Sequence, residues 1–196
     1  MAQPACGKLV VLSGPSGVGK TTVLRRLFSL CPLPLRASVS ATTRPPRPGE
    51  VQGVDYYFLT KEEFASRRQR GEFLEWYEVY NSGWWYGTLN REVATGLEAG
   101  YWVVLGIDVH GAASVVKQYP ETITIFLRTR SWEDLEARLR GRGTEDEAAV
   151  QRRLEQAKDE LAQAGWYRHQ VVNDELDRAV REICEILVRN GETQHV

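Results

Sequence analysis

The sequence predicts an α/β protein, in which a parallel β-sheet carries helices on both faces and an inserted lobe of short strands interrupts it. Apolar runs of strand length at 8–13, 101–107 and 122–127 alternate with segments of helical periodicity. Such apolar runs are expected of parallel strands buried on both faces. From about 36 to 90 this rhythm is lost, and the many Ser, Thr, Arg, Pro and aromatic residues there favour short, mostly antiparallel strands.

Helices are predicted where apolar residues recur at intervals of three or four. In the first of them, over 20–30, one face carries Val23, Leu24, Leu27 and Leu30. The others are expected over 61–73 with a stop at Gly71, over about 90–98 and 110–118, after the N-cap Ser131, and over 147–164 and 175–189, with a last short strand at 170–173.

The composition excludes several classes of protein. The 196 residues carry a formal net charge of −1, so no overall field favours nucleic acid or an anionic membrane. No apolar run reaches the roughly 20 residues that span a bilayer. Three scattered cysteines suggest neither a disulfide framework nor a zinc site, and the N-terminal residues lack a secretory pattern. We therefore expect a cytoplasmic protein that binds neither nucleic acid nor a membrane.

A glycine-rich loop follows the first predicted strand and opens the first helix. Its sequence, GPSGVGKTT, fits G-x-x-x-x-G-K-[ST] with Gly14, Gly19, Lys20 and Thr21. Glycines allow the backbone to curl so that main-chain N–H groups point at phosphate oxygens, and the helix N-terminus adds positive potential. The lysine can reach the β- and γ-phosphates of a nucleoside triphosphate, and the threonine hydroxyl can ligate Mg²⁺.

A second anion site is suggested by Arg44 and Arg47, which stand three apart among prolines that stiffen the backbone. Two guanidinium groups near tyrosine hydroxyls could clamp a second phosphate. A solvated basic turn is the alternative interpretation.

Further along, Glu75 stands among aromatic residues. A buried carboxylate there could accept hydrogen bonds from the two donors on the Watson–Crick edge of guanine, a pair that adenine lacks. The alternative is a strand glutamate in solvent.

Taken together, these segments resemble the guanylate kinases, which transfer a phosphoryl group from ATP to GMP. The resemblance covers roughly residues 8–188. It rests on segments that occur in the family order, namely GPSGVGKTT, SVSATTRPPRPGEVQGVDYYF, FLEW, YGT, IDVHGA, GRGTEDE and VND. It implies a single domain over 1–196 with a P-loop NTPase-type core at about 1–35, 92–130 and 165–196. The segment at about 36–91 is then the GMP-binding lobe, and 131–164 is a helical lid.

The resemblance also implies a role for individual residues. Those expected to act in catalysis are Lys20, Arg44, Arg138, Arg142 and Arg153. The residues expected to bind ATP are Gly14, Pro15, Ser16, Gly17, Val18, Gly19, Lys20, Thr21 and Thr22, with Asn173 near the adenine. The residues expected to bind GMP are Ser40, Arg44, Arg47, Tyr56, Glu75, Tyr86, Thr88 and Asp108. The implied substrates are ATP with Mg²⁺ and GMP or dGMP, in purine nucleotide metabolism and the recycling of GMP.

Two positions depart from the family pattern. Gly106 stands where the family commonly has an acid two residues before the aspartate. The segment that contains Trp84 and Trp85 is about two residues longer than usual, which bears on the geometry around Tyr86 and Thr88. These departures keep open a related kinase with another phosphorylated acceptor. A non-catalytic module that binds a phosphopeptide is a second alternative, although such modules typically have a degraded phosphate loop and the loop here is intact. The oligomeric state is undecided.

Overall fold

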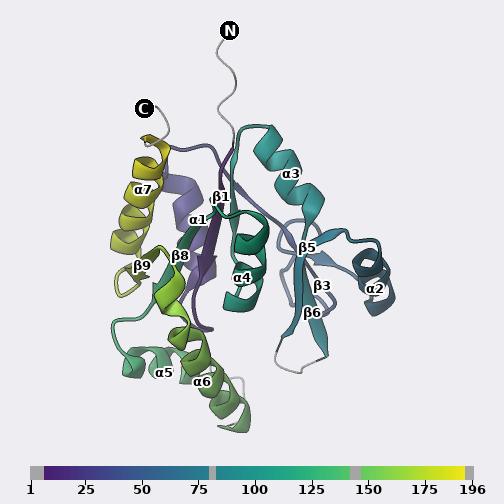
Figure 1. The fold of residues 1–196 in the computed structure, drawn as a ribbon. Coiled ribbons are helices and arrows are strands. Elements are labelled where there is room, and N and C mark those ends of the chain that lie inside the picture. Colours follow the sequence, from purple (N-terminus) through teal and green to yellow (C-terminus); the bar gives the residue numbers. More distant parts are fainter. Residues whose placement is uncertain (1–6, 80–82, 142–146, 193–196) are drawn as a thin grey trace. The chain divides into compact units, whose positions relative to one another are not determined.

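A computed structural model of the protein describes residues 7–79, 83–141 and 147–192 (Figure 1). The chain divides into two compact units. The first comprises Met1–Leu9, Arg36–Leu105 and His110–Thr122, and the second comprises Val10–Leu35, Gly106–Val109 and Ile123–Val196. Among the helices of the described ranges, none combines the length and the apolar character needed to cross a lipid bilayer.

The second unit is built on parallel strands. Its elements are β1 (Leu9–Ser13), α1 (Lys20–Leu30), β8 (Ile123–Arg128), α5 (Trp132–Arg140), α6 (Glu147–Ala162), the short 3-10 helix η1 (Ala164–Trp166), β9 (His169–Val172) and α7 (Leu176–Glu192). β8 pairs in parallel with β1 and with β9. These strands belong to a five-stranded sheet of order β2-β7-β1-β8-β9, in which β2 is Leu35–Ala37 and β7 is Trp102–Leu105. The predicted α/β class is thereby confirmed.

The first unit contains a second sheet of four strands in the order β4-β3-β6-β5. The elements that lie wholly or mostly in this unit are β2 (Leu35–Ala37), β3 (Ser40–Thr42), β4 (Tyr57–Phe58), α2 (Lys61–Gln69), β5 (Phe73–Val79), β6 (Trp84–Leu89), α3 (Asn90–Glu98), β7 (Trp102–Leu105) and α4 (Val109–Gln118). β3 pairs with β4 in parallel, whereas β6 runs antiparallel to both β3 and β5. The sheet is therefore mixed, as predicted for the inserted segment.

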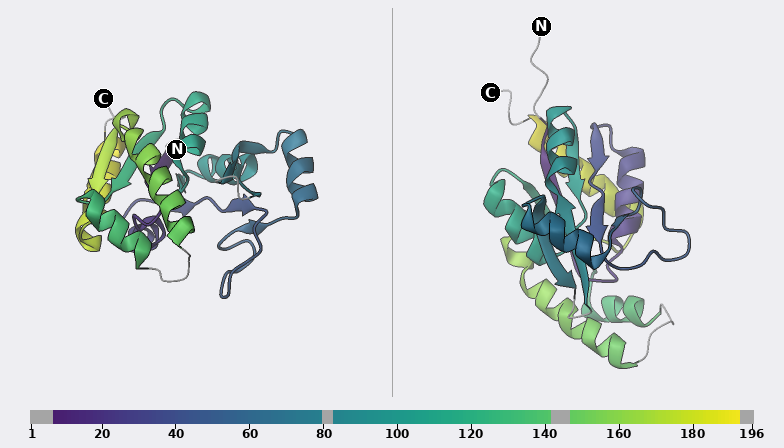
Figure 2. Two further views of the ribbon diagram at one scale, coloured as in Figure 1. Left: turned by 90° about the horizontal axis from the view of Figure 1, so that it is seen from below. Right: turned by 90° about the vertical axis from the view of Figure 1, so that its right-hand side faces the viewer.

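One face of the second sheet is covered by α2, as the right-hand view of Figure 2 shows. The buried side chain of Phe64 on α2 packs against Ala41, Phe73 and Leu89 of the strands. Helix α2 ends at Gln69 with Arg70 as its C-cap, so the predicted stop at Gly71 is confirmed; the φ of 67° at Gly71 favours glycine. Thr60 caps its first turn in a capping box with Glu63, in which each side chain accepts from the other's main-chain N–H.

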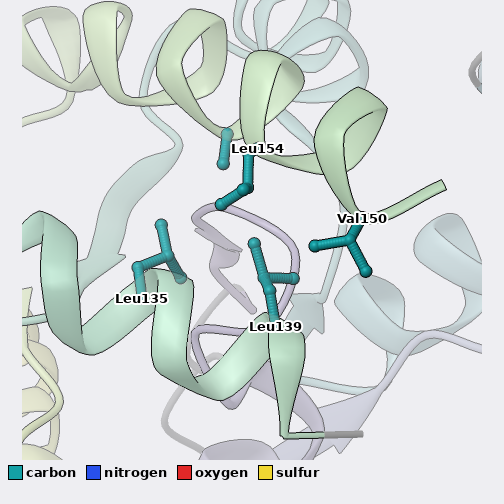
Figure 3. Close-up of a cluster of buried hydrophobic side chains, with 5 residues drawn as sticks. Leu135, Leu139, Val150 and Leu154 are labelled. Atoms are coloured by element: carbon teal, nitrogen blue, oxygen red, sulfur yellow. The ribbon is translucent and has the colours of Figure 1, made fainter. Parts of the chain in front are cut away.

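Helices α5 and α6 pack through a separate apolar cluster (Figure 3). Leu135 and Leu139 of α5 face Val150 and Leu154 of α6, and all four are buried. The Ser131 hydroxyl accepts from the main-chain N–H of Asp134 at 3.2 Å, which confirms the predicted N-cap of α5. The assignment of 131–164 as a lid stays a prediction.

Most of the predicted helix faces are buried, with one clear exception. Val23 and Leu27 of α1 are buried, but Leu30 is 46% exposed, because it lies at the last position of the helix. The periodicity correctly indicated the face of the helix, but it could not show that the neighbouring elements leave its end uncovered.

Candidate nucleotide-binding sites

The glycine-rich loop lies between β1 and α1 in the second unit, as its sequence predicts. Gly19 is the N-cap of α1 and has a φ of 98°, a left-handed conformation that L side chains rarely adopt. A Cβ atom at Gly19 would also lie 2.7 Å from Nδ2 of Asn173. The conformation therefore favours glycine here, and any side chain would also require the Asn173 amide to move.

The first turn of α1 presents the groups that the motif predicts. The Nζ atom of Lys20 donates to the main-chain carbonyl of Gly14 and, at 3.4 Å, to that of Pro15, so the side chain folds back over the loop. Thr21 and Thr22 are exposed in the same turn. The loop thus combines a helix N-terminus, an ammonium group and two hydroxyls, which is the chemistry that binds the phosphates of a nucleotide.

Ser16 connects this loop to α6. Its hydroxyl accepts from Nη2 of Arg153 at 2.7 Å, and its main-chain N–H donates to Oε2 of Glu160 at 3.2 Å. Glu160 is 6% exposed, so this is a buried carboxylate against the loop. Arg153 was predicted to act on the phosphates, and the structure places it beside the loop. Glu160 was not predicted, and because it stands 144 residues from Ser16, no local pattern could have indicated it.

Two more of the predicted residues hold the other side of the loop. Nδ2 of the buried Asn173 donates to the carbonyl of Val18 at 2.7 Å. Arg138 donates to the same carbonyl at 3.3 Å and to the carbonyl of Asn173 at 2.8 Å. A cavity of about 460 Å³ lies alongside; it is lined by Arg130, Asp134, Ala137, Arg138, Asp174 and Glu175. Arg142 lies outside the described residues.

In the first unit, three of the residues predicted to bind guanine form a row across neighbouring strands. Ser40 of β3 is opposite Thr88 of β6, which is opposite Glu75 of β5. Residues paired in this way lie on the same face of a sheet. Glu75 is only 4% exposed, so its carboxylate is buried rather than solvated, and its Oε1 accepts from Oγ1 of Thr88 at 2.7 Å.

The next row on the same face continues the site. Thr42 is opposite Tyr86, which is opposite Tyr77, and the rings of the two tyrosines are stacked with centroids 6.4 Å apart. The Tyr86 hydroxyl accepts from Nε of Arg44 at 3.1 Å. Tyr77 was not predicted as a site residue. The register of β5 against β6 places it there, and that register requires the structure.

Arg44 is the centre of the predicted phosphate clamp. Its guanidinium carbon lies 5.6 Å from the ring centroid of Tyr56, and the Tyr56 and Tyr86 rings meet edge to face at 5.9 Å. Burial raises the pKa of the Tyr56 hydroxyl, which keeps it protonated and able to donate a hydrogen bond. The structure therefore brings Arg44, Tyr56 and Tyr86 together, and Arg47 is exposed on the adjoining turn.

Glu50 is an unpredicted member of this group. Its two carboxylate oxygens accept from Nη2 of Arg44 at 2.8 and 2.9 Å, and one of them also accepts from the main-chain N–H of Arg47 at 2.7 Å. Burial alone would raise the pKa of Glu50, but the hydrogen bonds from Arg47 and Arg44 outweigh it and hold that pKa below its usual value. The one sequence signal for Glu50 is the segment Arg47–Glu50, R-P-G-E, whose Pro-Gly pair is typical of a turn.

The remaining predicted residue, Asp108, belongs to the second unit, where its carbonyl accepts from Oγ of Ser13 at 3.4 Å. Gly106 is exposed, and a Cβ atom there would lie 2.6 Å from Cδ1 of Leu24, so a side chain at this position requires Leu24 to move. Trp85 packs on the hydrophobic cluster of the second sheet, and its main-chain N–H donates to Oγ1 of Thr43 at 2.9 Å. That tryptophan is therefore a partly buried residue that packs against the core of the second sheet.

A parallel sheet whose first strand leads through a glycine-rich loop into a helix defines the class of P-loop nucleotide-binding proteins. The family model for guanylate kinase matches residues 6–190. A guanylate kinase of Rhodopirellula baltica is 50% identical over 188 residues, which cover 95% of this chain and 90% of that protein. A guanylate kinase of Mycobacterium bovis is 48% identical over 187 residues, which cover 95% and 89%.

A solved structure gives the same result. The crystal structure of guanylate kinase from Anaplasma phagocytophilum superposes with a TM-score of 0.77 at 30% identity, over 94% of this chain and 86% of that chain. The chain belongs to the guanylate kinase family, whose activity is phosphoryl transfer from ATP to GMP.

Proposed function

We propose that the protein transfers the γ-phosphoryl group of ATP to GMP, and also to dGMP, with ATP bound by the 14–22 loop and GMP bound by the second sheet. The observation that carries the acceptor assignment is the row of Ser40, Thr88 and Glu75, in which Thr88 and Glu75 are buried. This row lies on the same face as the row containing Tyr86. A buried carboxylate held by a neighbouring hydroxyl needs a polar partner, and guanine supplies one.

The row accounts for selection of the base. Guanine offers the N1–H and the 2-amino group side by side, and the Glu75 carboxylate can accept from both, because each of its oxygens has two lone pairs. Oε1 already accepts from Thr88, which holds the carboxylate in place. Adenine lacks this pair of donors, so its binding leaves the buried carboxylate without the hydrogen bonds that guanine would supply, which costs more than an exposed mismatch.

The acceptor phosphate is assigned to Arg44, Arg47, Tyr56 and Tyr86. Arg44 and the two tyrosines already lie together, and the Tyr86 hydroxyl accepts from Arg44, so its own proton can be donated to a phosphate oxygen. A guanidinium and phenolic hydroxyls grouped in this way suit a phosphate dianion. Asp108 is proposed to serve the guanine and magnesium region.

The donor nucleotide is assigned to the loop of the second unit. Lys20 and the main-chain N–H groups at the start of α1 would hold the phosphates, while Arg138, Arg142 and Arg153 would stabilise the transferring group. Asn173 and the cavity beside Arg138 are proposed to receive the adenine. In the described ranges, no group of three or more His, Cys, Asp or Glu side chains is arranged to hold a metal.

We expect Mg²⁺ to be bound mainly through the nucleotide phosphates, with the exposed hydroxyl of Thr21 as the protein ligand. When bound, Mg²⁺ neutralises charge on the β- and γ-phosphates. The chain's own groups position the reactants: a bond forms between a GMP phosphate oxygen and the γ-phosphorus as the bond to the ADP oxygen breaks. A phosphate dianion needs no general base, so none is assigned.

The test is an assay of ADP formation, with Mg²⁺ and ATP, against GMP, dGMP, AMP, CMP and UMP. We expect turnover with GMP and dGMP and turnover at least about a hundredfold lower with the other three. Turnover with a different phosphorylated acceptor, or with none, would overturn the proposal. The expected place of the activity is the cytoplasm, in the recycling of GMP.

A further inference from the structure

The Glu50 carboxylate joins two parts of the predicted acceptor clamp, Arg44 and Arg47, although neither the sequence nor the proposed reaction assigns it a role. It receives hydrogen bonds from the side chain of Arg44 and from the main chain of Arg47. The side chains of Arg44 and Glu50 are 11% and 19% exposed, so the pair is partly shielded from water. Ion pairs of this kind are stronger than solvated surface pairs.

The local chain geometry holds Glu50 in this place. The main-chain N–H of Glu50 donates to the carbonyl of Arg47 at 3.0 Å, which closes a turn over Arg47–Glu50. Gly49, the third residue of that turn, has a φ of 87°, and Pro48 precedes it, as in a type II turn. The carboxylate then bonds back to the N–H of Arg47 at 2.7 Å and fixes the turn that carries the Arg47 side chain.

The same carboxylate fixes the direction of the Arg44 guanidinium. Nη2 is committed to Glu50, Nε donates to the Tyr86 hydroxyl at 3.1 Å, and Nη1 donates to the carbonyl of Pro45 at 2.6 Å. The fork is therefore held at all three nitrogens before a ligand binds. Nη1 carries two N–H groups and the Tyr86 hydroxyl carries a proton, so both can still serve an incoming oxygen.

We propose that Glu50 is a positioning residue for the acceptor phosphate, which holds the Arg44 fork and the Arg47 turn in the arrangement that binds it. The inference rests on the proposed GMP kinase function. The bond from the main-chain N–H of Arg47 does not involve a guanidinium group, so it can hold the Glu50 carboxylate in place while a phosphate binds to Arg44. Prearranged donors lower the ordering cost of binding, so removal of Glu50 should weaken GMP and not ATP.

The experiment measures kcat and both KM values for Glu50→Gln and Glu50→Ala. We expect Glu50→Ala to raise the KM for GMP at least about tenfold, from the loss of charge-assisted hydrogen bonds, with a kcat within about twofold and an unchanged KM for ATP. Glu50→Gln keeps one acceptor oxygen and should lie between. The control is Glu72→Gln, which removes two ion pairs, with Arg67 and with Arg70, elsewhere in the same unit and should change none of the constants.

The outcomes distinguish a failure of the role assigned to Glu50 from a failure of the proposed GMP kinase function. A fall in the KM for GMP would show that Glu50 competes with phosphate, and an unchanged KM would show that it does not act on the clamp; either result overturns the inference. Equal changes in the KM for GMP and for ATP would indicate a general loss of structure and would also overturn it. If Glu50→Ala does not fold, Glu50→Gln provides the same comparison. If the wild-type protein does not phosphorylate GMP, the proposed function itself has failed.

Discussion

The Thr88 hydroxyl donates to the Glu75 carboxylate at 2.7 Å, and the two residues are opposite each other on adjacent strands, with Ser40 opposite Thr88 on the third. Both partners are almost completely buried. A hydrogen-bonded carboxylate on a sheet face is a rigid acceptor, because the strands fix its backbone and the hydroxyl fixes its side chain. This relationship gives the sharpest test of base recognition.

Replacing Glu75 by Gln should reduce discrimination between GMP and AMP. The amide presents a donor where the carboxylate accepted, so GMP binds more weakly. The binding of AMP is not weakened further, because AMP lacks the two donors that the carboxylate accepts from. We expect kcat/KM for GMP to fall at least about tenfold and the GMP-to-AMP ratio to fall with it. The measurement is steady-state kinetics with both acceptors, and Glu72→Gln serves as the control. If the ratio is retained, the base is recognised elsewhere.

Replacing Lys20 by Ala should abolish most turnover while GMP still binds. The ammonium group is assigned to the β- and γ-phosphates, and removal of one such charged donor costs on the order of a hundredfold to a thousandfold in kcat. Turnover is measured by ADP formation, and GMP binding is measured by calorimetry without ATP. Comparable turnover in the variant would remove the assignment of the loop to ATP.

Replacing Glu160 by Ala should weaken ATP and leave GMP unaffected. The Glu160 carboxylate accepts from the main-chain N–H of Ser16 at 3.2 Å, and without it this part of the loop loses a charge-assisted hydrogen bond. We expect the KM for ATP to rise about fivefold or more. Hydrogen exchange over residues 14–20 should increase in parallel. An unchanged KM for ATP would mean that the loop keeps its conformation without this contact.

Replacing Leu139 by Ala should lower the free energy of unfolding by about 2–5 kcal/mol, because the side chain is 2% exposed and its loss leaves a cavity between α5 and α6. The measurement is urea unfolding. Leu30→Ala is the matched control, since Leu30 is 46% exposed and the same truncation there should cost about 0.5 kcal/mol or less. Equal losses in the two variants would show that the cluster does not stabilise the fold.

Much of the secondary structure could be predicted from the sequence, since its causes are local. Helix α1 begins at Lys20 as predicted, because the glycine before it ends the loop and the apolar period starts at once. The N-cap at Ser131 could be predicted because its hydroxyl stands three residues before the main-chain N–H of Asp134, which has no hydrogen-bond partner within the helix. The end of α2 has a local cause too, since Gly71 adopts the left-handed conformation that reverses the chain just after the helix.

The candidate site was predicted only in part. Most of the predicted site residues lie in segments with a strong sequence pattern, such as the glycine-rich loop. The burial of Glu75 could not be deduced, because a single glutamate in a strand can face either water or a neighbouring side chain. Glu50, Tyr77 and Glu160 were missed. Glu50 is close to Arg44 in the chain, yet its role depends on which way the turn folds its side chain. Tyr77 and Glu160 depend on strand register and on a contact between distant segments.

By itself the amino-acid sequence determined the fold class, the position of the phosphate-binding loop and the resemblance to the guanylate kinases, because periodicity, glycine spacing and motif order are written along the chain. Only the tertiary structure decided that Glu75 is buried beside Thr88, that Glu50 holds Arg44, and that Ser16 is fixed by Arg153 and Glu160. The physical reason is that burial and hydrogen-bond pairing are properties of neighbours in space, and strand register and helix packing choose those neighbours.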